Sequence, residues 1–258
     1  MRFPASAPFE LAPVSVEELR ARAPHEVHKS ETMNYRTMAP EPGGLFDPKL
    51  FGPGTVIDAP VPNGDAMIRP RKTWFARVAL AAPMLHPLLV ARARTQIAEL
   101  LGRTSEEVAT AAADVEASRA LVEGLDAKHT WMVLRELAVL PPDLRPLKLD
   151  DHMRWALTPI NMWYQRIINR NGRLKKLIEQ GAPASQLSAD WAELSAAIRG
   201  LAENDETNEP TLDADGDPMP SLRTLAGGTH RGLYDALAEL AAHAAAAPAA
   251  AASAAPAG

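Results

Sequence analysis

Residues 158–204 read TPINMWYQRIINRNGRLKKLIEQGAPASQLSADWAELSAAIRGLAEN, and this stretch decides the fold. Its apolar seam repeats with alternating spacings of four and three, first at Ile160, Tyr164, Ile167, Asn171, Leu174 and Ile178, and then at Leu187, Trp191, Leu194, Ile198 and Leu201. Thr158 and Pro159 supply an N-cap and a first helical residue, and Gly181 to Pro183 interrupt the pattern. This spacing predicts an antiparallel helical hairpin with coiled-coil packing. Each arm would project on the order of 30 Å.

The two arms differ in charge. The first carries the cations Arg166, Arg170, Arg173, Lys175 and Lys176, whereas the second carries Asp190, Glu193 and Glu203. One interpretation is a solvated face whose charges pair across the arms. The other is a basic ridge offered to an acidic partner. Asn171 on the seam also has two interpretations, because it can set the register at a cost in stability or face solvent where the arms diverge.

Outside the hairpin, the pattern predicts a mainly α protein with a few short strands and long loops. Residues 16–22 form a short helix and residues 71–80 a strand, in a segment otherwise rich in proline and glycine. An apolar stripe from residue 88 to 101 predicts a helix, and a capping box at Thr104 and Glu107 begins another that runs to about residue 123. A further helix is expected over residues 128–137, and a weak one over 232–242.

Composition excludes several classes of function. The chain has 258 residues, a net charge of −5 and no cysteine, so thiolate zinc sites, iron–sulfur clusters and cysteine nucleophiles are excluded. An acidic chain is not expected to bind nucleic acid by itself, so any contact with DNA would need an assembly. The absence of a long apolar stretch or an apolar leader predicts a cytoplasmic protein without a membrane span. No small-molecule substrate is expected.

One acidic motif resembles a metal site. Asp213, Asp215 and Asp217 alternate in DADGD, as carboxylates do around a divalent cation. The EF-hand interpretation fails because Pro218 occupies the glycine position and Thr224 the position of the bidentate glutamate. An acidic surface loop is therefore the preferred interpretation, and no cofactor, metal or catalytic residue is assigned. The histidines also lack metal-ligand spacing.

Three segments, in the family's order, resemble the N-terminal clamp region of the β′ subunit of bacterial RNA polymerase. Residues 31–37 (ETMNYRT), followed by GLF at 44–46 and FGP at 51–53, are similar to the opening of that family. Residues 139–147 (VLPPDLRPL) match its signature almost letter for letter. Residues 168–177 (INRNGRLKKL) resemble the first clamp helix. The resemblance covers roughly residues 8–235.

This resemblance implies a function for two segments. In the family the hairpin docks the σ factor, so the implied partner-binding residues are Arg166, Arg170, Asn171, Arg173, Lys175, Lys176, Asp190 and Trp191. The segment from residue 147 to 164 keeps the length of the lid loop, which helps to separate RNA from template. Arg145, Asp150, Arg154 and Trp155 are therefore implied to lie at nucleic acid. The family's DFDGD catalytic loop lies elsewhere, beyond the clamp helices, so DADGD is not its equivalent.

The chain also departs from the family pattern. The zinc ribbon that follows FGP is missing, and residues 54–66 bridge the gap. The second arm lacks the basic pattern of the family's σ-contacting tip, so Trp191, if exposed, would anchor a different partner.

The expected organisation has five parts. These are a loop-rich segment (1–87), a helical clamp segment with a lid-like loop (88–157), the hairpin (158–204), a linker with a weak helix (205–240) and an Ala/Pro tail (241–258). Two hypotheses follow. The chain is a partial or split β′-like subunit that is non-catalytic by itself, or it is a regulator or decoy that binds σ-like or other transcription proteins through the hairpin.

Overall fold

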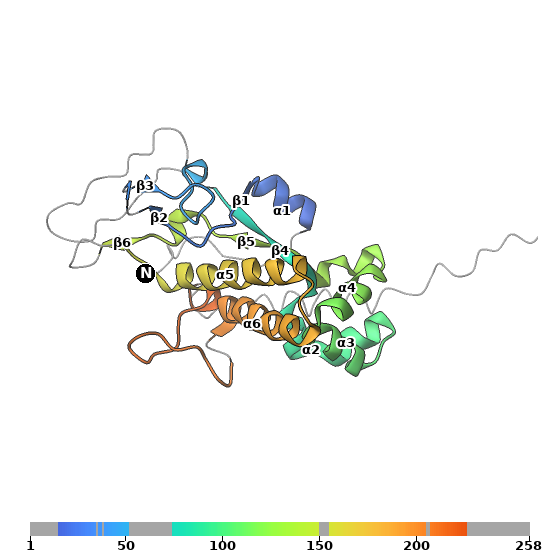
Figure 1. Cartoon of the computed structure of the whole chain (residues 1–258). Helices are drawn as coiled ribbons and strands as arrows, with labels where there is room; N and C mark the ends of the chain where they lie inside the picture. The colour runs from blue at the N-terminus through green and yellow to red at the C-terminus, as the bar shows by residue number, and fades with distance from the viewer. Residues whose placement is uncertain are drawn as a thin grey trace, which may run out of the picture.

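A three-stranded sheet and two long helices form the centre of the molecule (Figure 1). The computed structural model describes residues 15–34, 36–37, 39–51, 74–149, 155–204 and 207–225. The sheet has the order β1 (His25–Glu26), β4 (Ala76–Leu85) and β5 (Val133–Val139). β1 is parallel to β4, whereas β5 is antiparallel to it. The register of β4 and β5 shifts between Ala79 and Met84, which marks an irregularity in β4.

Three helices follow β4 and lie together at one end of the molecule (Figure 1). They are α2 (Pro87–Leu101), α3 (Ser105–Ala113) and α4 (Val115–Glu123). The predicted capping box at Thr104 and Glu107 is confirmed, because each residue bonds the other's main chain. The single helix expected over 104–123 is wrong, since Asp114 adopts an extended conformation and caps α4 through its side chain.

The helix expected over residues 128–137 is also wrong. A 3₁₀ turn covers Ala127–Met132, and the following residues form β5. β5 pairs with β4, which lies some fifty residues earlier in the chain, so a long-range partner overrides the local helical pattern. The strand expected at 71–80 corresponds to β4, which ends later, at Leu85, and residues 71–73 lie outside the described residues.

The helical hairpin is present. α5 (Pro159–Glu179) and α6 (Ala184–Glu203) run antiparallel, and Gly181 in the turn adopts a left-handed conformation with φ of 64°. Ile178 and Leu187 are partly buried, and the other eight apolar residues of the predicted seam are buried in the core: Ile160, Tyr164, Ile167, Leu174, Trp191, Leu194, Ile198 and Leu201. Gly200 lets the helices approach closely, because a Cβ atom there would lie 2.3 Å from the Trp163 ring.

The hairpin does not project freely from the body, in contrast to expectation. Near the turn, the indole nitrogen of Trp191 donates a 2.9 Å hydrogen bond to the main-chain oxygen of Ala112, at the end of α3. The Ser188 hydroxyl lies 3.2 Å from the Asp114 carboxylate, between α3 and α4. The first half of α6 is therefore packed against α3 and α4 (Figure 1).

The remaining elements are short. Among the described residues they are α1 (Val16–Arg22), β2 (Met33–Asn34) paired with β3 (Ala39–Pro40), β6 (Lys148–Leu149) paired with β7 (Trp155–Ala156), α7 (Leu222–Leu225), and 3₁₀ turns at Pro48–Leu50 and Pro142–Leu144. The prediction of α1 is confirmed to the residue. The weak helix predicted at 232–242 and the Ala/Pro tail lie outside the described residues. Within the described part of the chain, no helix is both long and apolar enough to cross a bilayer.

Candidate docking surface on the helical hairpin

The outward face of α5 carries a row of polar and cationic side chains. Arg166, Asn169, Arg173 and Lys176 follow one another at spacings of three and four, so they share one side of the helix, and all four are exposed. A shallow groove of about 690 Å³ runs beside the row. Among the described residues, its lining contains three arginines and no acidic side chain: Leu157, Met162, Gln165, Arg166, Asn169, Arg170 and Arg173.

Two of the arginines are paired within the hairpin. Arg170 contacts Glu193 at 2.6 Å, and Arg173 contacts Asp190 at 2.8 Å. Arg170 and Glu193 both remain partly exposed, so this pair contributes only about 0–1 kcal/mol. Asp190 is buried, with its side chain 4% exposed, so it lies inside the hairpin and not on a partner-binding surface. For these charges the interpretation as cross-arm ion pairs is confirmed.

Arg166 is held in a defined orientation at the edge of the groove. Its guanidinium group lies 5.2 Å from the centre of the Trp163 ring, within the range of a cation–π interaction. Its Nη1 atom also donates a 3.4 Å hydrogen bond to the Thr211 hydroxyl, on the segment after α6. Arg166 is thus pre-oriented, whereas Lys175 and Lys176 are exposed nearer to the turn.

Trp191 and Asn171 have structural roles. Trp191 is 1% exposed, so the suggested anchor for a partner is unavailable. Asn171 is 7% exposed and lies against β4, where its side chain accepts a 2.8 Å hydrogen bond from the Ala81 amide and donates a 2.9 Å bond to the Ala79 oxygen. The interpretation that Asn171 faces solvent is wrong, because it is buried and satisfies main-chain groups of β4 where the sheet register shifts.

Arg145 was predicted to lie at nucleic acid, and it is instead 1% exposed. It donates hydrogen bonds to the main-chain oxygens of Leu140 (2.7 Å) and Leu45 (2.6 Å) and to the side-chain oxygen of Asn161 (2.9 Å). Burial lowers its pKa to about 10, so it remains charged at neutral pH, with its guanidinium group 5.0 Å from the centre of the Phe46 ring. Arg145 therefore holds the two sequence motifs together in the core.

The other residues of the lid-like loop are not all described. Asp150 and Arg154 lie outside the described residues. Trp155 is described only by its backbone, which belongs to β7. Their predicted place at nucleic acid therefore stays a prediction.

The DADGD segment forms a tight turn. The Asp213 carboxylate accepts 3.0 Å hydrogen bonds from the amides of Asp215 and Asp217, and Gly216 adopts φ of 86°. This carboxylate therefore caps its own turn. In the described ranges, no group of three or more His, Cys, Asp or Glu side chains is placed to hold a metal ion.

Sequence reasoning missed four of the described residues that line the groove, among them Leu157 just before α5. Met162, Gln165 and Asn169 lie on the outward face, and Met162 is 40% exposed. The signal was available, because Met162 and Asn169 stand four residues before and three residues after Arg166. These residues are uncharged, so the pattern of cations along the helix did not indicate them.

Comparisons with known proteins agree with the motifs. Residues 103–229 match the family model described as RNA polymerase Rpb1, domain 1. In an alignment 315 positions long, the chain is 26% identical to the DNA-directed RNA polymerase subunit β′ of Clostridioides difficile (strain 630). The alignment covers 85% of this chain and 27% of that protein. In an alignment 289 positions long, it is 28% identical to the β′ subunit of Acholeplasma laidlawii (strain PG-8A). This alignment covers 76% of this chain and 21% of that protein.

The comparisons therefore show similarity to subunits of RNA polymerase, over about half of the chain for the family model. The similarity to the N-terminal region of bacterial β′ is confirmed. The chain spans about a quarter of the length of the relatives that it matches.

Proposed function

We propose that this chain is a β′-like clamp module that takes part in DNA-templated transcription without catalysing it alone. The observation that carries the proposal is the similarity to β′ over 85% of the chain. The contacts of Arg145 support it, because they join the GLF segment to the VLPPDLRPL segment. The two motifs therefore build one packed unit, to which other polymerase subunits would attach. Its place of action would be the cytoplasm.

The outward face of α5 is the proposed docking surface, and the helical pair would correspond to the clamp coiled coil. Arg166 and Lys176 are exposed on this face. Arg170 and Arg173 already neutralise Glu193 and Asp190, so they offer less charge to a partner. A partner such as a σ-like factor would therefore present carboxylates to Arg166 and Lys176 and an apolar side chain to Met162.

The experiment is affinity capture with the tagged full-length chain from bacterial lysate, followed by mass spectrometry. Recovery of RNA polymerase subunits supports the assembly member. Recovery of a σ-type protein without these subunits supports the alternative, a regulator that acts away from the enzyme. Recovery of neither kind of protein overturns both.

A charge-reversal pair tests the surface itself. The double variant Arg166→Glu with Lys176→Glu is expected to lose at least about tenfold in capture of the partner, since rim charges steer association. The matched control is Arg103→Glu with Arg119→Glu, which makes the same change in net charge on α2–α4. Equal loss in both variants would show a general charge effect and would remove the α5 face from the proposal.

A further inference from the structure

The first helix is attached to the molecule mainly through charged side chains. None of the seven residues of α1 is buried. Ser15 caps its N-terminus by accepting a 3.1 Å hydrogen bond from the Glu18 amide, and Arg22 forms an ion pair with Glu18 within the helix. The helix therefore buries little apolar surface, which is the usual source of tertiary stability.

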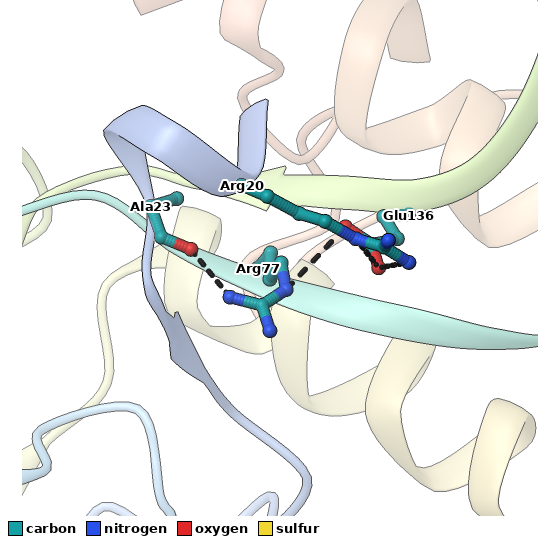
Figure 2. Close-up of polar contacts among 4 residues, drawn as sticks. All are labelled: Arg20, Ala23, Arg77 and Glu136. Carbon is teal, nitrogen blue, oxygen red and sulfur yellow. Dashed lines mark hydrogen bonds and ion pairs between the residues drawn. The ribbon is translucent and has the colours of Figure 1, made fainter. Parts of the chain in front are cut away.

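The carboxylate of Glu136, on β5, binds the helix through Arg20 (Figure 2). Arg20 donates a 2.9 Å hydrogen bond from Nε to Oε1 of Glu136, and its Nη2 atom lies 2.8 Å from the same oxygen. The Glu136 side chain is 6% exposed, whereas that of Arg20 is 61% exposed. In this contact, the acceptor Glu136 is buried and the donor Arg20 is largely exposed to solvent.

Arg77 on β4 completes the cluster (Figure 2). Its Nε atom lies 3.3 Å from the second carboxylate oxygen of Glu136, without hydrogen-bond geometry. Its Nη1 atom donates a 2.6 Å hydrogen bond to the main-chain oxygen of Ala23, the residue that ends α1. Arg77 therefore supports Glu136 by charge and also fixes the point at which α1 leaves the body.

The chain after α1 is anchored separately. Ala23 and Val27 are buried, and β1 pairs with β4. Pro24 disfavours helical conformation at Ala23, so α1 cannot continue into β1. Residues 15–22 can consequently leave the sheet without unpairing β1.

We propose that α1 is a releasable strap, held over the sheet by the clasp of Arg20, Glu136 and Arg77. Breaking the Arg20–Glu136 contact frees α1 as a unit about Ala23 and Pro24. The core around α5 stays folded in both states.

Hydrogen exchange of the full chain, followed by mass spectrometry, tests the strap. Arg20→Ala is expected to raise exchange of residues 16–22 by about tenfold, the effect of losing one charge-assisted hydrogen bond. Exchange in β4 and α5 is expected to stay unchanged. Raising NaCl from 0.05 M to 1 M is expected to act in the same direction on the wild-type chain, because salt screens an exposed cation.

Arg22→Ala is the matched control. It removes the same charge from the same helix, but the partner of Arg22 is Glu18 and not Glu136. If Arg22→Ala accelerates exchange as much as Arg20→Ala, the clasp does not hold the helix and the proposal fails. It also fails if Arg20→Ala accelerates exchange in α5 equally, since α1 would then belong to the core.

Discussion

The Nη2 atom of Arg145 donates a 2.6 Å hydrogen bond to the main-chain oxygen of Leu45, which lies 100 residues earlier in the chain. Asn161 completes the arrangement, because its side-chain nitrogen donates a 2.8 Å bond to the Arg145 oxygen. An arginine of the signature motif thereby ties the N-terminal segment to α5.

Arg145→Lys is expected to destabilise the chain by about 3 to 5 kcal/mol. A lysine cannot reproduce the planar set of donors, so buried acceptors on Leu45, Leu140 and Asn161 would lose their partners. Urea unfolding followed by circular dichroism measures the change. Arg135 is exposed on β5, and Arg135→Lys should change stability by less than about 0.5 kcal/mol. Equal stability of the two variants would contradict the structural role of Arg145.

Asn171→Ala is expected to cost about 2 to 3 kcal/mol. The variant leaves the Ala81 amide and the Ala79 oxygen without the side chain that satisfies them. Asn169→Ala, one half-turn earlier on the exposed face, should cost less than about 0.5 kcal/mol. Thermal unfolding of both variants gives the comparison, and similar melting temperatures would refute the role of Asn171.

Two glycines of the hairpin are expected to respond in opposite directions. Gly200→Ala places a methyl group 2.3 Å from the Trp163 ring, so we expect a loss of about 1 to 3 kcal/mol. Gly172→Ala meets no atom within 4 Å and should stabilise α5 by about 0.5 to 1 kcal/mol. Denaturant unfolding of both variants checks the signs. Stabilisation by Gly200→Ala would show that α6 does not pack on Trp163 this closely.

The free energy of unfolding is expected to decrease as the pH is lowered, because of His86. Its Nδ1 atom accepts the amide of Leu88 at the start of α2, and burial lowers its pKa from 6.5 to about 4. At pH values between about 4 and 6.5, His86 binds a proton in the unfolded chain but not in the native chain. The stabilisation is complete above pH 6.5 and is lost as the pH falls toward 4.

Because His86 keeps part of its surface in solvent, we expect a loss of about 1 to 2 kcal/mol between pH 7 and pH 5. Urea unfolding at the two pH values measures it. His86→Asn keeps a capping side chain without a titrating ring, so its stability should change less over this interval. His25→Gln is the control that should keep the wild-type slope. An unchanged slope in His86→Asn would exclude His86 as the cause.

Local signals predicted α1, the capping box at Thr104 and both helices of the hairpin, because each depends on residues within a few positions. Pairing over long distances explains the main error. Residues 133–137 have an acceptable helical pattern, yet β4 supplies a strand partner that no local window contains. The break at Asp114 has a different cause, because this residue ends α3 and caps α4 with its side chain, although the surrounding residues fit one continuous helix.

The site was predicted less completely than the fold. The charge pattern predicted a cationic first arm, and Arg166, Arg173 and Lys176 are exposed on α5. It did not show that Asp190, Trp191 and Arg145 are buried, since burial depends on what packs against the hairpin from distant parts of the chain. A motif shared with a family indicates importance without distinguishing packing from contact with a partner.

The central claim is that the outward face of α5 meets another subunit of the transcription machinery. Lysine cross-linking with mass spectrometry tests it most directly, using the full chain mixed with purified RNA polymerase subunits and a σ factor. We predict intermolecular cross-links from Lys175 and Lys176, and their loss in the Arg166→Glu variant. Intermolecular cross-links confined to Lys29 and Lys49, or none at all, would contradict the claim.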